Sequence, residues 1–215
     1  MTAKALFLAK RARPDIQTAV SFLCTRVKRP DEDDYKKLGR LMKYLQGTRE
    51  MTLTIEPDNI QVVKWWVDAS YAVHSDMKSH TGGFMSLGKG TVYGTSTKQK
   101  LNTKSSTEAE LVGVDDCMLQ IIWTGYFLKE QGYDVVNKLY QDNQSAIKLE
   151  ENGRRSSGKR TRHINIRYFF VKDRIEKKEL FVDYCPTEDM IADYFTKPLQ
   201  GALFQKFRKM ILNHE

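Results

Sequence analysis

Cysteine is scarce in this chain, and long hydrophobic runs are lacking. The three cysteines, Cys24, Cys117 and Cys185, lie far apart in apolar surroundings, with no C-x-x-C pattern and no paired Cys/His spacing. This argues against a disulfide framework or a zinc site and favours a reducing, intracellular compartment. No apolar run is expected to span a bilayer, and the apolar part of "MTAKALFLAKRARPD" is too short for a signal peptide. We therefore expect a soluble protein with no membrane partner.

Positive charge, by contrast, is in excess. The 215 residues are 40% hydrophobic and 29% charged, enough for one domain with a core and a smaller appendage. The formal net charge is +8, which favours an anionic partner. Nucleic acid is the commonest such partner of a soluble intracellular chain. Charge alone does not identify it.

The first half of the chain changes from a helical to a strand pattern. Residues 1 to about 50 are predicted to be helical, because "RPDIQTAVSFLCTRV" and "DEDDYKKLGRLMKYLQGT" combine helix start signals with apolar residues at helical spacing. The period then becomes two, so "IQVVKWWVDAS" and "TGGFMSLGKGTVYGTST" predict strands, with "GKG" as a hairpin turn inside the second segment.

In the second half, helices and strands alternate. We expect, in order, a long helix over 107–131, a strand "NKLYQ", a short helix "QSAIKLEE", a basic loop "NGRRSSGKR", a helix "HINIRYFFVKDRIEKK", a strand "ELFVDYC" and a helix from Glu188 broken at Pro198. Three strands in a meander, followed by strands that alternate with helices, predict a mixed sheet with helices packed on it.

The stretch "TKSSTEAELVG" places two glutamates at the start of the long predicted helix. Glu110 lies at the edge of the apolar face of this helix, whereas Glu108 lies on the other side. Both also fit capping boxes, with Thr107 and Ser105 respectively, and acids are favourable at the positive end of a helix dipole. Taken alone, these residues are better explained as caps than as catalytic groups.

Three other acids stand where an isolated carboxylate is unusual. Asp68 ends the predicted strand "VVKWWVD", Asp142 ends "KLYQD" where a strand leads into a helix, and Asp193 lies in the predicted helix "EDMIADYFTK". Each has a simpler explanation: Asp68 could begin a turn, Asp142 could cap the next helix, and Asp193 could face solvent.

In combination, the four acids are more informative. Two at strand ends, one at a helix start and one in a late helix could meet at the carboxyl edge of a single sheet. Four converging carboxylates repel one another unless cations neutralise them, and hard ions such as Mg²⁺ prefer oxygen ligands. A pair of such ions roughly 4 Å apart is the arrangement used for in-line attack at phosphorus, which is nuclease chemistry.

Five motifs now occur in a recognisable order: "VDASYAVHSDMKSHTGGFMSL", "TKSSTEAELVGV", "LYQDNQSAI", "TRHINIRYFFVKDRI" and "MIADYFTKPL". Together they resemble the ribonuclease H domain of copia-type retrotransposon Pol polyproteins, over about residues 60–199. The resemblance implies a ribonuclease H-like α/β fold, in which a mixed five-stranded sheet is flanked by helices.

The preceding residues resemble the segment that joins the reverse transcriptase to the ribonuclease H domain in those polyproteins. We therefore expect a helical connection-like segment over 1–58, a ribonuclease H domain over 59–199 and a helical tail over 200–215. The Y-x-D-D signature of a polymerase site is absent, so no polymerase activity is expected from this chain.

The family pattern assigns four catalytic and metal-binding carboxylates: Asp68, Glu110, Asp142 and Asp193. Glu110 rather than Glu108 matches, because the family's A-E-L pattern requires the acid that precedes the apolar residue. The resemblance implies two Mg²⁺ ions, for which Mn²⁺ could substitute. One would be held by Asp68 and Asp193, the other by Asp68, Glu110 and Asp142, and cleavage would leave a 5′ phosphate and a 3′ hydroxyl.

Nucleic-acid contacts are expected from basic residues in two regions. The candidates are Arg154, Arg155, Lys159, Arg160, Arg162 and His163 in and after the basic loop, and Lys98, Lys100 and Lys104 in "STKQKLNTK". A solvated loop explains the basic run equally well. Many ribonucleases H carry a histidine in a loop before the last carboxylate, but "VDYCPTEDMIAD" has none, so product release or metal exchange would work differently here.

The expected function is hydrolysis of the RNA strand of an RNA:DNA hybrid during reverse transcription. The expected partners are the hybrid and the reverse transcriptase domain of the same polyprotein, in a cytoplasmic virus-like particle or replication complex, or in the nucleus. One alternative is a catalytically silent ribonuclease H fold that acts as a nucleic-acid-binding connection module. Another is a related two-metal enzyme such as an integrase or a junction resolvase.

Overall fold

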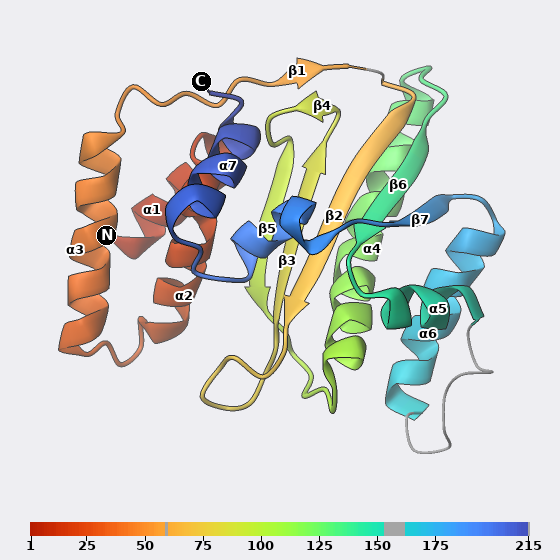
Figure 1. Ribbon diagram of the computed structural model, residues 1–215, viewed down its shortest axis with the longest axis horizontal. Coiled ribbons are helices and arrows are strands. Elements are labelled where there is room, and N and C mark those ends of the chain that lie inside the picture. The colour runs from red at the N-terminus through yellow and green to blue at the C-terminus, as the bar shows by residue number, and fades with distance from the viewer. Residues whose placement is uncertain (59, 153–161, 215) are drawn as a thin grey trace.

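The computed structural model describes residues 1–58, 60–152 and 162–214, with the backbone alone for residues 152 and 162–166. Its centre is a five-stranded mixed sheet (Figure 1). In spatial order the strands are β5 (Tyr93–Lys98), β3 (His80–Ser86), β2 (Val62–Ser70), β6 (Val136–Gln141) and β7 (Leu180–Tyr184). The pairs β5–β3 and β3–β2 are antiparallel, whereas β2–β6 and β6–β7 are parallel. The predicted mixed sheet is therefore confirmed.

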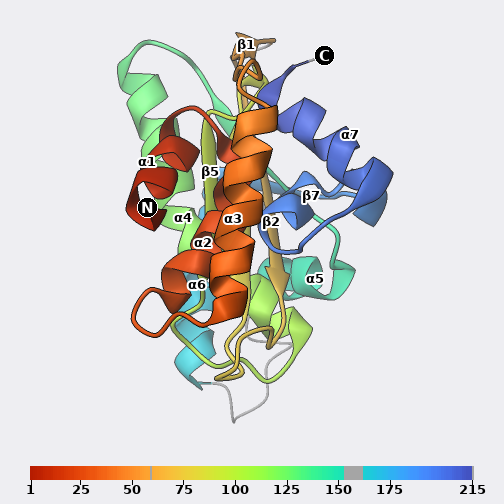
Figure 2. The same ribbon diagram turned by 90° about the vertical axis from the view of Figure 1, so that its left-hand side faces the viewer.

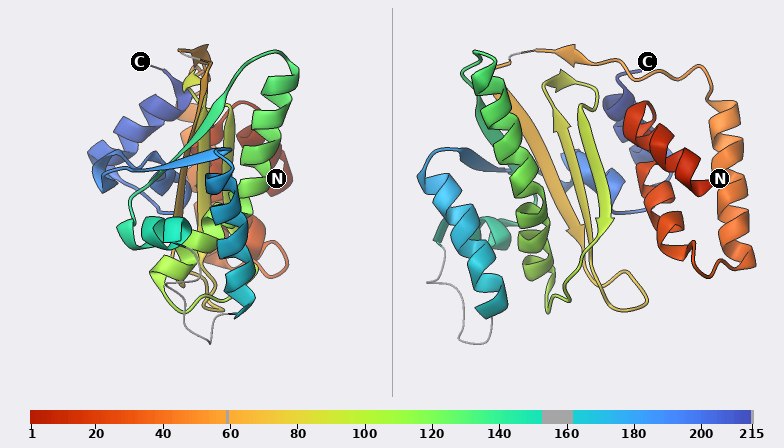
Figure 3. Two further views of the ribbon diagram at one scale, coloured as in Figure 1. Left: turned by 90° about the vertical axis from the view of Figure 1, so that its right-hand side faces the viewer. Right: turned by 180° about the vertical axis from the view of Figure 1, so that it is seen from behind.

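The two faces of this sheet are covered by different parts of the chain, because successive side chains of β2 point to opposite faces. Trp65 and Val67 pack with α4 (Ser106–Glu130) and α6 (Arg162–Glu176). Trp66, on the other face, packs with η4 (Ile191–Phe195) and α7 (Gly201–Leu212). Figure 3 shows this division, with α4 and α6 on one side and α7 on the other.

The helix α4 corrects one expectation. By length and apolar composition it is long enough to cross a membrane, contrary to the expectation that no such run exists. In this fold it is a core helix, because Val114, Met118 and Ile121 are completely buried against the sheet.

The N-terminal residues form the predicted helices. They are α1 (Thr2–Arg11), the short 3-10 helix η1 (Pro14–Ile16), α2 (Gln17–Arg26) and α3 (Glu32–Gly47). Asp31 caps α3 in a reciprocal capping box with Asp34. Figure 2, in which these helices face the viewer, shows them at the β5 side of the sheet.

This helical segment has a core of its own and also contacts the sheet edge. The Ser21 hydroxyl donates to the Ser96 carbonyl at 2.6 Å, and Lys10 Nζ donates to the Gly94 carbonyl at 2.9 Å. Both acceptors belong to the edge strand β5, so the segment satisfies backbone groups that a bare edge would leave open.

Two predicted elements differ from the structure. The "GKG" turn contains β4 (Gly88–Lys89), which pairs with β1 (Glu56–Pro57) in a separate two-stranded sheet. The helix predicted from Glu188 is instead two 3-10 helices, η3 (Thr187–Asp189) and η4. Between them, Met190 has ψ of 82°, which no helix permits.

Tyr194 in η4 contacts the N-terminal helices η1 and α2 as well as α7. Its hydroxyl donates to the Asp15 carbonyl at 3.0 Å, and its own carbonyl accepts from the Thr18 hydroxyl at 2.6 Å. Its ring stacks on Phe204 of α7, with the centroids 5.3 Å apart. The 3-10 helix that carries Asp193 is thus fastened both to the N-terminal helices and to α7.

Gly82 permits η4 to lie directly on the sheet. It is the antiparallel partner of Asp68 in the β2–β3 register. A Cβ atom at Gly82 would lie 2.6 Å from Thr196 Cγ2 and 2.9 Å from the Ala192 carbonyl oxygen. Real Cβ atoms do not approach backbone oxygens this closely, so only glycine fits without moving η4.

We predict that Gly82→Ala lowers the free energy of unfolding by about 1–3 kcal/mol, because the added methyl group overpacks the contact between β3 and η4. Urea denaturation monitored by circular dichroism measures this change. The control is Gly113→Ala in α4, where the new Cβ would meet its neighbours at 3.5 Å, an ordinary contact. Equal stability of the two variants would contradict the prediction.

Candidate functional site

Asp68 lies in β2, near the middle of the main sheet. It is 2% exposed, and its Oδ2 accepts a hydrogen bond from the Thr196 hydroxyl. The sequence had allowed a turn beginning at this residue, but β2 continues through Ser70. Val67 and Ala69, the residues before and after Asp68, are both paired with β3. The Asp68 carboxylate therefore has a well-defined direction, toward the face of the sheet covered by η4.

The two glutamates of α4 differ in their contacts, and Glu108 belongs to the helix cap as predicted. Ser105 is the N-cap, and its hydroxyl accepts from the Glu108 backbone N–H at 3.2 Å. The Glu108 carboxylate in turn accepts from the Lys104 N–H at 2.7 Å. Glu110 makes no part of this cap and is only 5% exposed. Glu108 is therefore the capping residue, and Glu110 is available for another role.

Asp142 directly follows β6, the parallel neighbour of β2. Its Oδ2 accepts from the Thr187 hydroxyl at 3.0 Å. The sequence had also suggested Asp142 as the cap of the helix that follows, α5 (Gln144–Asn152). Asn143 has this role instead, since its Oδ1 accepts from the backbone N–H groups of Ser145 and Ala146 at 3.0 and 3.1 Å.

These three acids form one cluster. One carboxylate oxygen from each of Asp68, Glu110 and Asp142 lies within 4.8 Å of the other two. All three line an open cleft of about 660 Å³. Burial, and then the nearby Asp68 and Asp142, raise the pKa of Glu110 well above its usual value.

The donor set suits a hard divalent cation. Glu110 Oε2 is buried and has no hydrogen-bond partner among the described residues. Buried polar oxygens normally have a partner, so this atom is free to bind a metal ion or a water molecule. Three carboxylates with no nitrogen or sulfur donor favour Mg²⁺ or Mn²⁺ over zinc. The cluster is thus compatible with divalent metal binding.

Asp193 lies next to Asp68 and interacts with it electrostatically. It lies in η4, not in the predicted α-helix, and is 4% exposed. Burial and the neighbouring Asp68 carboxylate raise its pKa, while an ion pair with Lys197 opposes the rise. Asp193 is not one of the three acids whose oxygens lie within 4.8 Å of one another, and its connection to them is through Asp68.

Lys197 is the residue of this site that the sequence interpretation missed. Its Nζ lies 2.6 Å from Asp193 Oδ1 and 3.6 Å from Asp68 Oδ2, and its side chain lines the cleft. The four-residue spacing from Asp193 could have indicated an ion pair, as on a helix. Its approach to Asp68 depends on tertiary packing and leaves no signal in the sequence.

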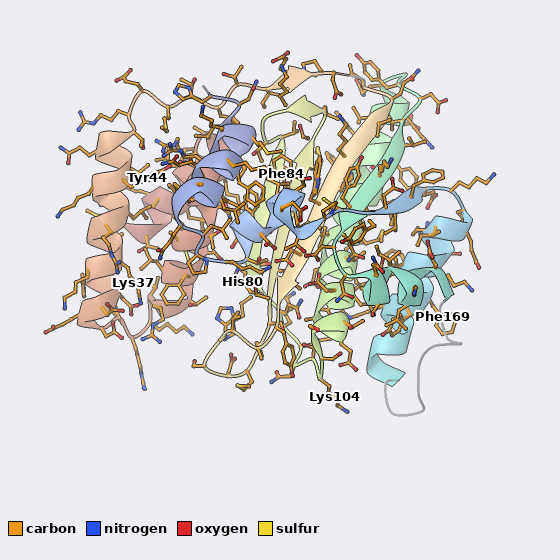
Figure 4. All side chains as sticks on the ribbon, in the orientation of Figure 1. Lys37, Tyr44, His80, Phe84, Lys104 and Phe169 are labelled. Carbon is orange, nitrogen blue, oxygen red and sulfur yellow. The ribbon has the colours of Figure 1, made fainter. Side chains whose placement is uncertain are left out.

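The predicted nucleic-acid contacts are only partly described. Arg154, Arg155, Lys159 and Arg160 lie outside the described residues, and of Arg162 and His163 only the helical backbone of α6 is described. Lys98 pairs with Asp76 at 2.7 Å. Lys100 and Lys104 are exposed, and Figure 4 shows Lys104 near the end of the molecule toward which β2 runs.

Comparisons with known proteins find homologues among retroelement polyproteins. No family model matches the chain. Over 202 residues, 93% of this chain, it is 33% identical to the retrovirus-related Pol polyprotein from transposon RE1 and 32% identical to that from transposon RE2, both of Arabidopsis thaliana. The homologues of this chain are thus retrovirus-related Pol polyproteins of copia-type plant transposons. A tobacco relative, from transposon TNT 1-94 of Nicotiana tabacum, is 29% identical over 204 residues.

The chain spans a small part of these polyproteins, 14% of the length of both Arabidopsis relatives. Among solved structures, it is similar to a ribonuclease H1 isolated from compost, with a TM-score of 0.47, 11% identity, and coverage of 63% of this chain and 92% of that one. The same compost enzyme in complex with an RNA/DNA hybrid gives a TM-score of 0.42 at 10% identity, covering 60% of this chain and 88% of that one. The structure itself confirms the predicted α/β class, a mixed five-stranded sheet flanked by helices.

A further buried acid lies close to the site. Glu150 of α5 is completely buried. With the Gln141 amide oriented so that its nitrogen faces Glu150, it donates to both carboxylate oxygens at 3.2 Å. Burial raises the pKa of Glu150 to about 8, so the folded protein keeps this group protonated near neutral pH. Gln141 immediately precedes Asp142, so this contact supports the end of β6.

We predict that Glu150→Gln removes a pH-dependent loss of stability. Between the ordinary pKa of 4.5 and about 8 the unfolded chain releases this proton while the folded protein retains it. The free energy of unfolding therefore falls as pH rises through that window. Urea denaturation at several pH values should show a stability advantage of the variant that grows with pH. For the exposed control Glu130→Gln, no such growth is expected; parallel curves for Glu150→Gln and wild type would contradict the prediction.

Proposed function

We propose that this chain hydrolyses the RNA strand of an RNA:DNA hybrid, by two-metal-ion catalysis, during reverse transcription of a retroelement. The observation that carries the proposal is the convergence of Asp68, Glu110 and Asp142 within 4.8 Å. They come from a strand, a helix start and the end of a parallel strand. Asp193 joins them through Asp68, so the acids that the sequence motifs select belong to one site. The Pol polyprotein homology supplies the context.

Asp68, Glu110, Asp142 and Asp193 are the residues that would hold two Mg²⁺ ions, or Mn²⁺ in their place. When bound, such ions supply an activated water and stabilise the leaving oxygen of an in-line displacement at phosphorus. Asp68 interacts with Glu110 and Asp142 and also with Asp193, and the Thr196 hydroxyl orients it. The Thr187 hydroxyl does the same for Asp142. The products are a 5′ phosphate and a 3′ hydroxyl.

Basic residues would bind the phosphates of the substrate. Lys100 and Lys104 belong to the segment that leads from β5 into α4, and the exposed Lys104 precedes the helix that carries Glu110. The loop with Arg154, Arg155, Lys159 and Arg160, and the neighbouring Arg162 and His163, follow α5 in the sequence. Phosphate contacts position a duplex, while 2′-hydroxyls in the minor groove distinguish RNA from DNA. The natural substrate is thus a hybrid presented by the polymerase part of the same polyprotein, in a cytoplasmic particle or the nucleus.

The alternatives predict different substrates. A silent binding module would bind hybrid without cleaving it, and an integrase-like or resolvase-like enzyme would cut duplex DNA. Metal-dependent cleavage of hybrid, duplex DNA and single strands therefore separates all three. The four acids favour the nuclease, because a binding module gains nothing from burying mutually repelling carboxylates.

We predict that Asp68→Asn lowers the rate of RNA cleavage by about a thousandfold or more, since it removes a ligand whose metals contribute several kcal/mol to transition-state stabilisation. The assay follows an end-labelled RNA strand in a hybrid with Mg²⁺ or Mn²⁺, with EDTA as a further control. Asp183→Asn, which removes an exposed carboxylate paired with Lys138 in the same sheet, is the matched variant and should retain activity. Full activity of Asp68→Asn would refute the assignment.

We predict that charge reversal of Lys100 and Lys104 to Glu weakens hybrid binding and reduces the slope of log K against log salt by about 2, one per lost phosphate contact. Fluorescence anisotropy with a labelled hybrid measures both quantities. Lys129→Glu with Lys209→Glu makes the same charge change at exposed positions near the C-terminal ends of α4 and α7. Identical slopes for the two double variants would rule out a specific grip.

A further inference from the structure

We infer that Lys197 is a built-in counter-cation that occupies one metal position and must be displaced before a divalent ion binds there. This inference rests on the proposed function and adds a regulatory step to it. The side chains that face Lys197 are the very carboxylates, Asp68 and Asp193, that the family pattern assigns to one of the two ions.

The contacts of Lys197 are those of a cation shared by two acids. Its Nζ donates to Asp193 Oδ1 at 2.6 Å and lies 3.6 Å from Asp68 Oδ2. The side chains of Asp193 and Asp68 are 6% and 3% exposed, so both carboxylates are removed from water. An ammonium group at these distances stabilises both carboxylates in their charged form.

The ammonium group and a divalent ion would therefore compete for the same oxygens. Mg²⁺ requires direct oxygen ligands at about 2.1 Å, and carboxylate oxygens already hydrogen-bonded to an ammonium group are poorer ligands. Lys197 thus lowers the affinity of the free protein for the ion between Asp68 and Asp193. The position formed by Glu110 and Asp142 is less affected, because among the described residues Lys197 forms its ion pairs with Asp68 and Asp193 and interacts with Asp142 only at longer range.

The Lys197 side chain also has room to move away from the two carboxylates. Its side chain is 41% exposed, unlike those of its two partners. With Ser70 and Val73 it lines both the carboxylate cleft and a neighbouring cleft of about 810 Å³ bordered by α2, α3 and η4. A lysine stem has four rotatable carbons, so the ammonium group can leave the carboxylates without a backbone change.

A bound nucleic acid would favour this movement. Phosphates in the cleft attract the ammonium group away from Asp68 and Asp193, which frees both carboxylates for the ion. Substrate and the ion at this position therefore increase each other's affinity, as any two coupled ligands must. The free protein would carry this ion rarely and the hybrid complex would carry it readily.

The test measures Mn²⁺ binding to the whole chain, without nucleic acid, by isothermal titration calorimetry. We expect Lys197→Met to tighten one binding event by about tenfold, because the competing charge is gone, and Lys197→Arg to bind as wild type does. The control is Lys206→Met, which breaks a similar lysine–aspartate pair of 2.8 Å with Asp189, away from the cluster. Lys206→Met should leave the affinities of both Mn²⁺ binding events unchanged.

The outcomes are distinguishable. Wild-type Mn²⁺ binding with no tightening in Lys197→Met would overturn the counter-cation while leaving the proposed function intact. Absence of Mn²⁺ binding in every folded variant would refute the metal site itself, and with it the proposed function. If circular dichroism shows that Lys197→Met is unfolded, Lys197→Gln is measured in its place, since it keeps a polar group between the two acids without the charge.

Discussion

The central constraint in this molecule is electrostatic: several carboxyl groups, three of them buried, lie close together beside one open cleft. Each loses hydration on burial, and each repels the others, so the cluster opposes folding unless something compensates. Compensation is visible at every member. The pKa of Glu110 and that of Asp193 are raised, hydroxyl groups of Thr187 and Thr196 bind Asp142 and Asp68, and Lys197 supplies a positive charge.

Strands, an α-helix and a 3-10 helix together bring these carboxyl groups to one place. A parallel pairing brings the ends of β2 and β6 to one edge, and the first turn of α4 reaches the same place. On the opposite face of the sheet, η4 approaches closely because Gly82 lacks a side chain. The site thus depends on one strand whose alternate residues face two different layers. Val67 belongs to the core beneath α4, and Asp68, the next residue, faces η4.

Much of this could be predicted from the sequence, and the failures have physical causes. Period-two alternation identified β2, and the A-E-L pattern separated Glu110 from the cap Glu108. The two-residue strand β4 was missed because its partner, β1, lies about thirty residues away and leaves no periodic signal. The short η4 was mistaken for an α-helix because a 3-10 turn has almost the same local composition. The role of Lys197 depends on a tertiary approach to Asp68, 129 positions earlier in the chain, which spacing cannot reveal. Division into segments 1–58, 59–199 and 200–215 stays a prediction.

The contacts of Tyr194 determine how a shorter fragment of this chain would behave. A fragment of residues 59–199 would retain all five strands of the main sheet and all four acids. It would nevertheless lose Asp15 and Thr18, which hydrogen-bond Tyr194, and Phe204, on which its ring stacks. The residue next to Asp193 would then keep only its contacts with the sheet. The sequence motifs therefore identify the four acids, whereas residues on either side of the motifs hold Tyr194, and with it Asp193, in place.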